Sequence, residues 1–249
     1  MIPLKTAEEV KYIRESGLIV AGVLDKLRKV IEPGIKTIEL DRITGDFIHA
    51  KKAESAFLGF KGFPKNICVS INSEVIHGIP CDRIIEKGDI VSLDIGVAKD
   101  GYYADAAITV GVEVIKEDVE RLLNSTRESL LKGIGKAVSG NRLGDISWAI
   151  QYYTEKSGFS VVRQFVGHGI GRQLHEEPQI PNFGSPGQGP KLREGMVLAI
   201  EPMVSFGGYE VKIADDGWTA VTKDGSLSAH FEHTVAITDN GPVILTGLE

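Results

Sequence analysis

Two aspartates stand in the middle of what the sequence predicts to be a β-hairpin, LDIGVAKDGYYADAAITV (residues 93–110). Aspartate is disfavoured in strands, so Asp94 and Asp105 need an explanation. With Lys99 and Asp100 at the centre of the turn, the two aspartates are predicted to lie directly opposite each other on one face. Like charges so placed repel each other, which leaves three arrangements. One carboxyl is protonated, both lie in water, or a cation lies between them.

Three further side chains could bind the same cation. Glu201 lies in LAIEPM, Glu232 in AHFEHT, and His168 in the glycine-rich stretch GHGIGRQLHEE. Carboxylates buried without partners in such apolar surroundings would each cost several kcal/mol. Two aspartates, two glutamates and a neutral imidazole balance two divalent cations, and this ligand set favours Mn, Fe, Co or Zn. Such a metal pair activates water for hydrolysis. The hairpin by itself, however, is explained equally well as an exposed sheet face that carries two solvated aspartates.

The elements that must position these residues alternate between pairs of helices and groups of strands. Thr6 and Glu9 form a capping-box pattern before a helix that ends at Pro33, and a second helix is expected at about 37–52. A strand is expected at 67–71, before the hairpin. Two more helices follow from about Glu117, then a strand at 160–166, and the chain from Met196 onward is predicted to form strands. The pattern predicts an α+β protein.

The two halves of the chain resemble each other. EKGDIVSLDIGV (86–97) aligns without gaps with REGMVLAIEPMV (193–204), a shift of 107 residues that places Asp94 on Glu201. The turn glycines Gly34 and Gly140 differ by 106 residues. Two matches of this kind also arise by chance, so duplication and coincidence both remain open. If the halves are duplicated, each supplies a carboxylate from an equivalent strand to a shared centre.

Composition limits the classes of function. The 249 residues carry a net charge of −6, which argues against non-specific binding to nucleic acid or anionic membranes. The two cysteines, Cys68 and Cys81, form neither a CxxC pair nor a disulfide framework, as is typical of a reducing compartment. No signal-peptide pattern or membrane-spanning apolar run is present in the sequence. We therefore expect a soluble, cytoplasmic protein.

In their order along the chain, the five candidate ligands resemble the dinuclear metal site of the methionine aminopeptidases. The resemblance is carried by NSEVIHGIP, LDIGVAKDGYYADAA, VGHGIGRQLHEEP, AIEPM and HFEHT, and it runs nearly end to end. It implies the "pita-bread" (creatinase/aminopeptidase) fold, in which two pseudo-symmetric α/β halves form a curved antiparallel sheet covered by helices.

The resemblance is to the short bacterial type 1 form. Only 33 residues separate His168 from Glu201, which leaves no room for the helical insertion of type 2 enzymes. No N-terminal zinc extension is expected either. The expected organisation is one catalytic domain, 1–249, with an internal repeat of roughly 1–115 and 116–249.

The resemblance also implies roles for the five ligands. Asp94 would chelate the first metal, Asp105 and Glu232 would bridge both metals, and His168 and Glu201 would complete the second. Glu201 would also act as general base and acid, moving a proton from the metal-bound hydroxide nucleophile to the leaving amine.

Further residues are expected around the substrate. By resemblance, His175 would stabilise the oxyanion and His77 would hydrogen-bond near the scissile amide, although His77 alone fits a loop histidine bound to its own backbone. His230 and His233 are expected to support the ligands or to lie at the surface. The methionine pocket would be lined by Phe60, Phe63, Cys68, His77 and Trp218, although an aromatic cluster by itself is more typical of a core.

The resemblance implies a metal-dependent aminopeptidase that removes initiator methionine from nascent chains whose second residue is small. Its cofactors would be two divalent ions (Co, Mn, Fe or Zn), with a monovalent cation near Asn72 and Ser228. Its partners would be nascent N-termini, with the ribosome as a further candidate. Direct nucleic-acid or membrane binding is not expected, and the expected state is a monomer.

Two alternatives share the fold. One is an Xaa-Pro aminopeptidase or prolidase, which uses the same five ligands but usually carries an additional N-terminal domain. The other is a non-catalytic pita-bread protein that binds a partner, although such relatives typically lose metal ligands.

Overall fold

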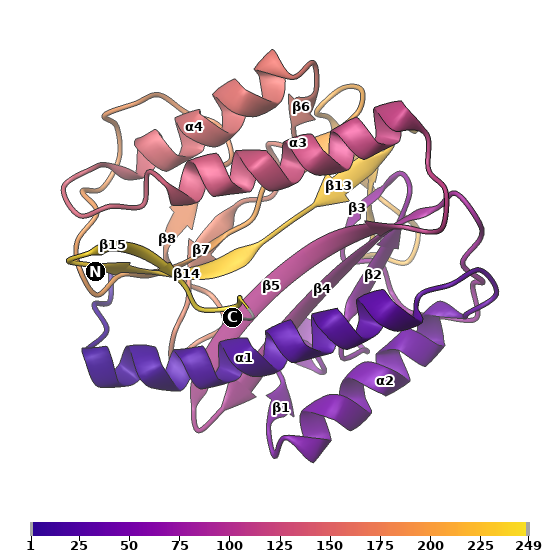
Figure 1. Ribbon diagram of the computed structural model, residues 1–249, viewed down its shortest axis with the longest axis horizontal. Helices are drawn as coiled ribbons and strands as arrows, with labels where there is room; N and C mark the ends of the chain where they lie inside the picture. The colour runs from indigo at the N-terminus through magenta and orange to yellow at the C-terminus, as the bar shows by residue number, and fades with distance from the viewer. Residues whose placement is uncertain (1, 248–249) are drawn as a thin grey trace.

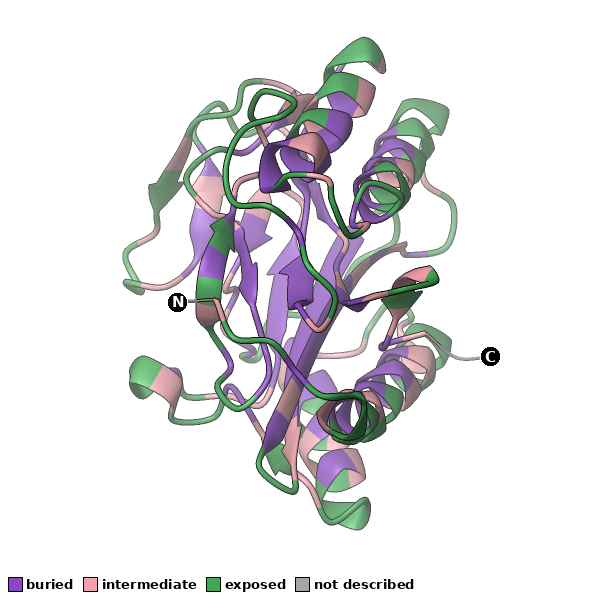
Figure 2. Ribbon diagram, turned by 90° about the vertical axis from the view of Figure 1, so that its left-hand side faces the viewer, coloured by how far each residue is buried: buried purple, intermediate pink, exposed green. Residues whose placement is uncertain are grey.

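The helices of the computed structural model, which describes residues 2–247, form two pairs, one from each half of the chain. α1 (Ala7–Val30) lies beside α2 (Thr37–Ala50), and α3 (Glu117–Ile134) lies beside α4 (Leu143–Lys156). Figure 1 shows one pair above the other, with strands visible between them, and Figure 2 shows both pairs on the same side of the strands. The opposite face of the strands is therefore left for the site.

The first helix begins where the sequence predicts. The backbone N–H of Glu9 donates to the Thr6 hydroxyl at 3.2 Å, and the backbone N–H of Thr6 donates to the Glu9 carboxylate at 2.9 Å. These bonds satisfy two N–H groups that a helix start leaves without intrahelical partners, so the predicted capping box is confirmed.

The sheet of the first half is built on the long hairpin. β4 (Ile90–Lys99) pairs with β5 (Tyr102–Gly111) on one side and with β2 (Cys68–Ile71) and β1 (Glu54–Ser55) on the other, all antiparallel. A single 3₁₀ turn, η1 (Phe60–Gly62), lies in the loop between β1 and β2. α1 packs across β4 and β5.

The sheet of the second half repeats this arrangement. Its central order is β7 (Gly167–Gly169), β9 (Val197–Ile200) and β14 (His233–Thr238), antiparallel like β2, β4 and β5. The outer strands are β8 (Glu176–Ile180) and β15 (Gly241–Ile244). A helix pair followed by this three-strand unit thus occurs twice, which confirms the α+β architecture of two pseudo-symmetric halves.

Two small antiparallel sheets complete the fold. One joins β13, β10 and β6, and the other joins β11, β12 and β3. The strand predicted at 160–166 is much shorter, because only Ser160 and Val161 pair with β10 before the chain enters the loop that contains Phe165. The bounds are β3 (Glu74–Ile76), β6 (Ser160–Val161), β10 (Met203–Ser205), β11 (Val211–Ile213), β12 (Ala220–Thr222) and β13 (Ser228–His230).

Each helix pair covers its own apolar core. α1 packs on β4 and β5, and α2 packs on α1 and β1. Leu24 of α1, Leu40 of α2 and Leu93 of β4 belong to one buried apolar core. α3 packs on β13, β10, β9 and β5, and α4 packs on α3 and β6. Leu122 of α3 and Leu198 of β9 belong to the second buried apolar core. Burial at roughly 25 cal/mol per Å² of apolar surface makes these two cores the main source of stability. The strands that carry the site are packed against these two cores.

Candidate metal centre and substrate pocket

The hairpin register differs from the prediction by one residue at the turn. Asp100 and Gly101 form the turn with φ of 52° and 77°, so Asp105 lies opposite Gly96 and Asp94 lies opposite Ala107. Asp-Gly is favoured in such two-residue turns because both positions need positive φ. The predicted direct opposition of the two aspartates is therefore wrong. They are diagonal neighbours on the same face, still within reach of each other.

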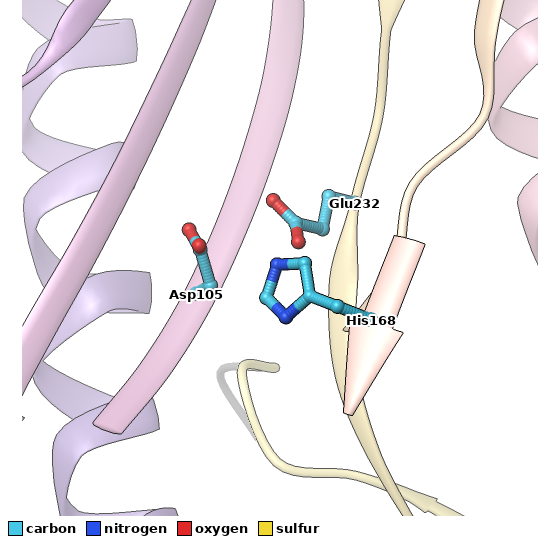
Figure 3. A group of neighbouring side chains, drawn as sticks. All are labelled: Asp105, His168 and Glu232. Atoms are coloured by element: carbon cyan, nitrogen blue, oxygen red, sulfur yellow. The ribbon is translucent and has the colours of Figure 1, made fainter. Parts of the chain in front are cut away.

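The other candidate ligands come from the second half. His168 lies in β7 opposite Ala199, and Glu201 follows β9, where the Asn182 side-chain amide donates to its backbone carbonyl at 3.0 Å. Glu232 lies between β13 and β14. Figure 3 shows Asp105, His168 and Glu232 pointing toward one another from three segments, and one ligand atom from each lies within 4.8 Å of the others.

All four carboxylates are buried, with side chains that find few polar partners. Asp94 Oδ1, Asp105 Oδ1 and Glu232 Oε1 have no hydrogen-bond partner among the described residues. Burial raises the pKa of each carboxyl, and repulsion from the neighbouring acids raises the pKa of Asp94, Glu201 and Glu232 further. The pKa of Asp105 is raised by burial to about 7. Orphaned buried oxygens on carboxylates that face one another fit divalent cations, which would satisfy these oxygens and balance the charge.

The histidine of the cluster presents a lone pair to the site. His168 Nδ1 lies 2.9 Å from the carbonyl of Gly169 and must donate to it, so Nε2 is left unprotonated. Burial lowers the pKa of His168 to about 3, so the imidazole is neutral. Its Nε2 lies 3.6 Å from Glu201 Oε1. Two acceptor atoms at this distance do not form an ion pair, but they can share a metal.

A cavity of about 180 Å³ opens onto these five side chains. Phe60 stacks on His175 with 5.2 Å between ring centroids, and Phe63 packs edge-on against Trp218 at 5.2 Å. Every pocket residue predicted from the sequence lines this cavity. The list is Phe60, Phe63, Cys68, His77, His175 and Trp218.

Several residues that line the cavity were not predicted from the sequence. Phe165 packs edge-on against His77 with 5.6 Å between centroids, and Phe57, Lys61, Ile76, Val166 and Leu174 complete the wall. Phe165 and Leu174 are close in sequence to His168 and His175, and this proximity could have identified them as residues of the cavity wall. His77 itself has φ of 63°, an uncommon conformation for a residue with a side chain. Burial lowers its pKa to about 4, helped by the positive charges of His175 and Lys61.

The two histidines beside Glu232 differ in environment. His230 is only 1% exposed, and its Nε2 lies 3.7 Å from Glu201 Oε2. His233 Nδ1 is 2.9 Å from the Thr246 hydroxyl, away from the cavity. Asn72 and Ser228 are also neighbours, because the backbone N–H of Ser228 donates to the Asn72 carbonyl at 2.8 Å.

Comparison with known proteins assigns the family. Residues 11–239 match the model of metallopeptidase family M24. The methionine aminopeptidase of Clostridium perfringens is 56% identical over 246 residues, which cover 99% of both chains. The crystal structure of the Thermotoga maritima methionine aminopeptidase superposes with a TM-score of 0.98 at 47% identity, covering 100% of both chains. The chain belongs to the methionine aminopeptidases of family M24.

This membership confirms the resemblance to the bacterial methionine aminopeptidases and the pita-bread fold. The chain is therefore a metallopeptidase. A prolidase from Pyrococcus furiosus shares the fold alone, with a TM-score of 0.80 at 23% identity over 99% of this chain and 66% of the prolidase. No helix among residues 2–247 combines the length and the apolar character that a membrane crossing requires.

Proposed function

We propose that the protein removes methionine from the N-terminus of polypeptides whose second residue is small. The observation that carries the proposal is that five buried ligand-type side chains line the same cavity as a group of aromatic and other apolar side chains. The relatives above bear the name of this activity, and this chain matches them over its full length.

In this proposal Asp94, Asp105, His168, Glu201 and Glu232 hold two divalent ions. The orphaned oxygens of the buried carboxylates and the free Nε2 of His168 support this assignment. When bound, such ions supply polarisation of the scissile carbonyl and activation of water. The same residue types accept Co, Mn, Fe or Zn. The proposal includes a monovalent cation near Asn72 and Ser228, supported only by their proximity.

Glu201 is proposed to take a proton from water and return it to the leaving amine. Its carboxylate lines the cavity together with the other four candidate ligands, where a bound water and the leaving amine would lie. His175 at the cavity wall is proposed to donate to the developing oxyanion, and His77 to hydrogen-bond near the scissile amide.

The methionine side chain is proposed to lie between the aromatic rings of the cavity. Phe63 and Trp218 present ring edges, and the Cys68 sulfur lies in the same wall, which suits a polarizable thioether. Among residues 2–247 no tyrosine lines this cavity, so methionine selection would rest on apolar contact. The proposed partners are nascent chain ends in the cytoplasm, near the ribosome, with the protein acting as a monomer.

The test is hydrolysis of two peptides by protein reconstituted with Co²⁺ or Mn²⁺. Met-Ala-Ser should be cleaved to free methionine, and a peptide that begins Ala-Pro should not. Cleavage of the Ala-Pro peptide alone would point to a prolidase-type enzyme. Metal-loaded protein that cleaves no peptide with an N-terminal methionine would indicate a non-catalytic binding protein.

A further inference from the structure

The carboxylate of Glu201 lies between two imidazoles. Oε1 is 3.6 Å from Nε2 of His168, and Oε2 is 3.7 Å from Nε2 of His230. Glu201 therefore has a histidine facing each of its oxygens, one in the predicted ligand set and one outside it.

The two histidines offer opposite hydrogen-bonding chemistry. The N–H of His168 is used by the carbonyl of Gly169, so His168 faces Glu201 with a lone pair. Neither ring nitrogen of His230 has a hydrogen-bond partner among the described residues. An imidazole always carries at least one N–H. His230 can therefore meet Oε2 as a donor, and a small rotation of the carboxylate would close 3.7 Å to a hydrogen bond.

The backbone holds the His230 ring in this place. The backbone N–H of His230 donates to the Thr109 hydroxyl at 2.8 Å, and the backbone carbonyl of His230 accepts from the same hydroxyl at 2.8 Å. Because Thr109 has only one hydroxyl proton, Ser92 must be the donor in the 2.8 Å bond between Ser92 and Thr109. His230 thus sits on β13, tied to β5 of the other half.

His230 does not touch the space where a substrate would bind. Its side chain is 1% exposed and does not line the cavity, whereas Glu201 does. The ring of His230 faces the cavity-lining carboxylate of Glu201, and an influence of the ring on the reaction would act through that carboxylate. An unpartnered polar ring buried to this degree is costly unless it has a partner when the site is in use.

We propose that the Nε2–H of His230 donates a hydrogen bond to Oε2 of Glu201 and thereby turns Oε1 toward the metal position beside His168. His230 is then a positioning residue. This inference rests on the proposed function, because it takes Glu201 as a metal ligand. Supporting hydrogen bonds of this kind are typically worth 10–100-fold in metal affinity or activity.

The first experiment compares two variants of His230 with the wild-type protein. His230→Gln keeps a donor at roughly the reach of Nε2, whereas His230→Leu keeps volume without a donor. Calorimetric titration of metal-depleted protein with Mn²⁺ should show affinity reduced about 10–100-fold in His230→Leu and largely restored in His230→Gln. The kcat for Met-Ala-Ser should follow the same order, with KM little changed. His49→Leu, at an exposed histidine on α2, serves as the control.

The second experiment determines which ring nitrogen of His230 carries the proton, and it needs no measurement of activity. Nitrogen-15 spectra of the imidazoles in Zn²⁺-loaded protein should show His230 protonated at Nε2, with the signal assigned by its loss in His230→Gln. Protonation at Nδ1 alone would overturn the proposal, as would equal losses of Mn²⁺ affinity in the two variants or no loss in His230→Leu. If His230→Leu does not fold, the tautomer of His230 and the Mn²⁺ titration of His230→Gln still test the proposed hydrogen bond.

These outcomes remain distinct from failure of the proposed function. Wild-type protein that binds Mn²⁺ but releases no methionine would defeat the proposed activity and leave the affinity and tautomer results readable. Wild-type protein that cleaves Met-Ala-Ser, with His230 protonated only at Nδ1, would keep the activity and reject the role of His230.

Discussion

The backbone N–H of Glu232 donates a 2.9 Å hydrogen bond to the carbonyl of Ala107, the residue that pairs with Asp94 across the hairpin. This bond joins the loop between β13 and β14 to the centre of β5. Because Ala107 is also two residues from Asp105, one contact sets the spacing between Glu232 and both aspartates. The two halves of the chain therefore meet at the carboxylates themselves.

Removal of metal should destabilise the protein more at high pH than at low pH. The carboxyls of the cluster have folded-state pKa values raised by burial, so the metal-free folded protein binds more protons than the unfolded chain. Its stability then falls as pH rises from about 4, the ordinary value, through the raised values. Metal binding requires the deprotonated groups and relieves their repulsion.

The measurement is the difference in Tm between Mn²⁺-loaded and EDTA-treated protein at pH 5.5 and pH 8. The difference should be larger at pH 8. An equal difference at the two pH values would contradict a metal site built on these four carboxylates.

Glu201→Gln should abolish most turnover while substrate binding persists. The amide cannot accept and return a proton, so kcat for Met-Ala-Ser should fall by about 10²–10⁴-fold, with a smaller change in peptide affinity. Metal content must be measured in the same samples, since Glu201 is also a proposed ligand. Glu194→Gln, at an exposed position nearby in the sequence, should behave as wild type. Unchanged turnover in Glu201→Gln would remove Glu201 from the mechanism.

Gly96→Ala should narrow the pocket. A Cβ at Gly96 would lie 2.7 Å from the ring of Phe57 and 2.9 Å from the Cβ of Ala56, so the Phe57 wall must move. We expect a loss of about 1–3 kcal/mol in unfolding free energy and a raised KM for Met-Ala-Ser. Gly135→Ala is the matched control, because its nearest atom, the carbonyl of Leu131, lies 3.5 Å away. Equal behaviour of the two variants in urea unfolding would argue against the contact.

Lys5→Met should lower the free energy of unfolding and leave the loop that ends at His175 less ordered. The Lys5 ammonium pairs with the Glu176 carboxylate in a buried position, and that carboxylate also accepts the backbone N–H groups of Arg172 and Gln173. Loss of one partner of a buried pair costs about 3–5 kcal/mol. Urea unfolding should show this loss, and kcat should fall because the loop is less ordered.

The double variant Lys5→Met with Glu176→Gln provides the control for charge burial. It removes the uncompensated carboxylate, so part of the lost stability should return. A double variant no more stable than Lys5→Met alone would mean that the ion pair is not the source of the effect.

The two cysteines should differ in reactivity. Burial raises the pKa of the Cys68 thiol well above its ordinary value, and the charge of Asp94 raises it further, whereas Cys81 is exposed. The native protein should therefore titrate one thiol with Ellman's reagent, and denatured protein two. Cys81→Ser should leave the native protein unreactive. A native Cys81→Ser variant that reacts rapidly would show Cys68 to be accessible.

Local features were predictable because their determinants are close in sequence. The Thr6–Glu9 capping box and the start of the helix at Glu117 appear as predicted. The hairpin was also predicted, but its register was not. Two turn positions were available one residue apart, and the positive φ values of Asp100 and Gly101 select the later one.

The sequence by itself determined which chemistry the protein could carry. Asp94, Asp105, His168, Glu201 and Glu232 stand out because acids in apolar strands are costly without a cation, and that argument needs only residue type and neighbours. Tertiary structure decided how these groups face one another. The bond from Glu232 to Ala107, the pairing of Lys5 with Glu176 and the approach of His230 to Glu201 join residues from 29 to 171 positions apart. Such contacts are set by the packing of two cores against each other, which no local pattern records.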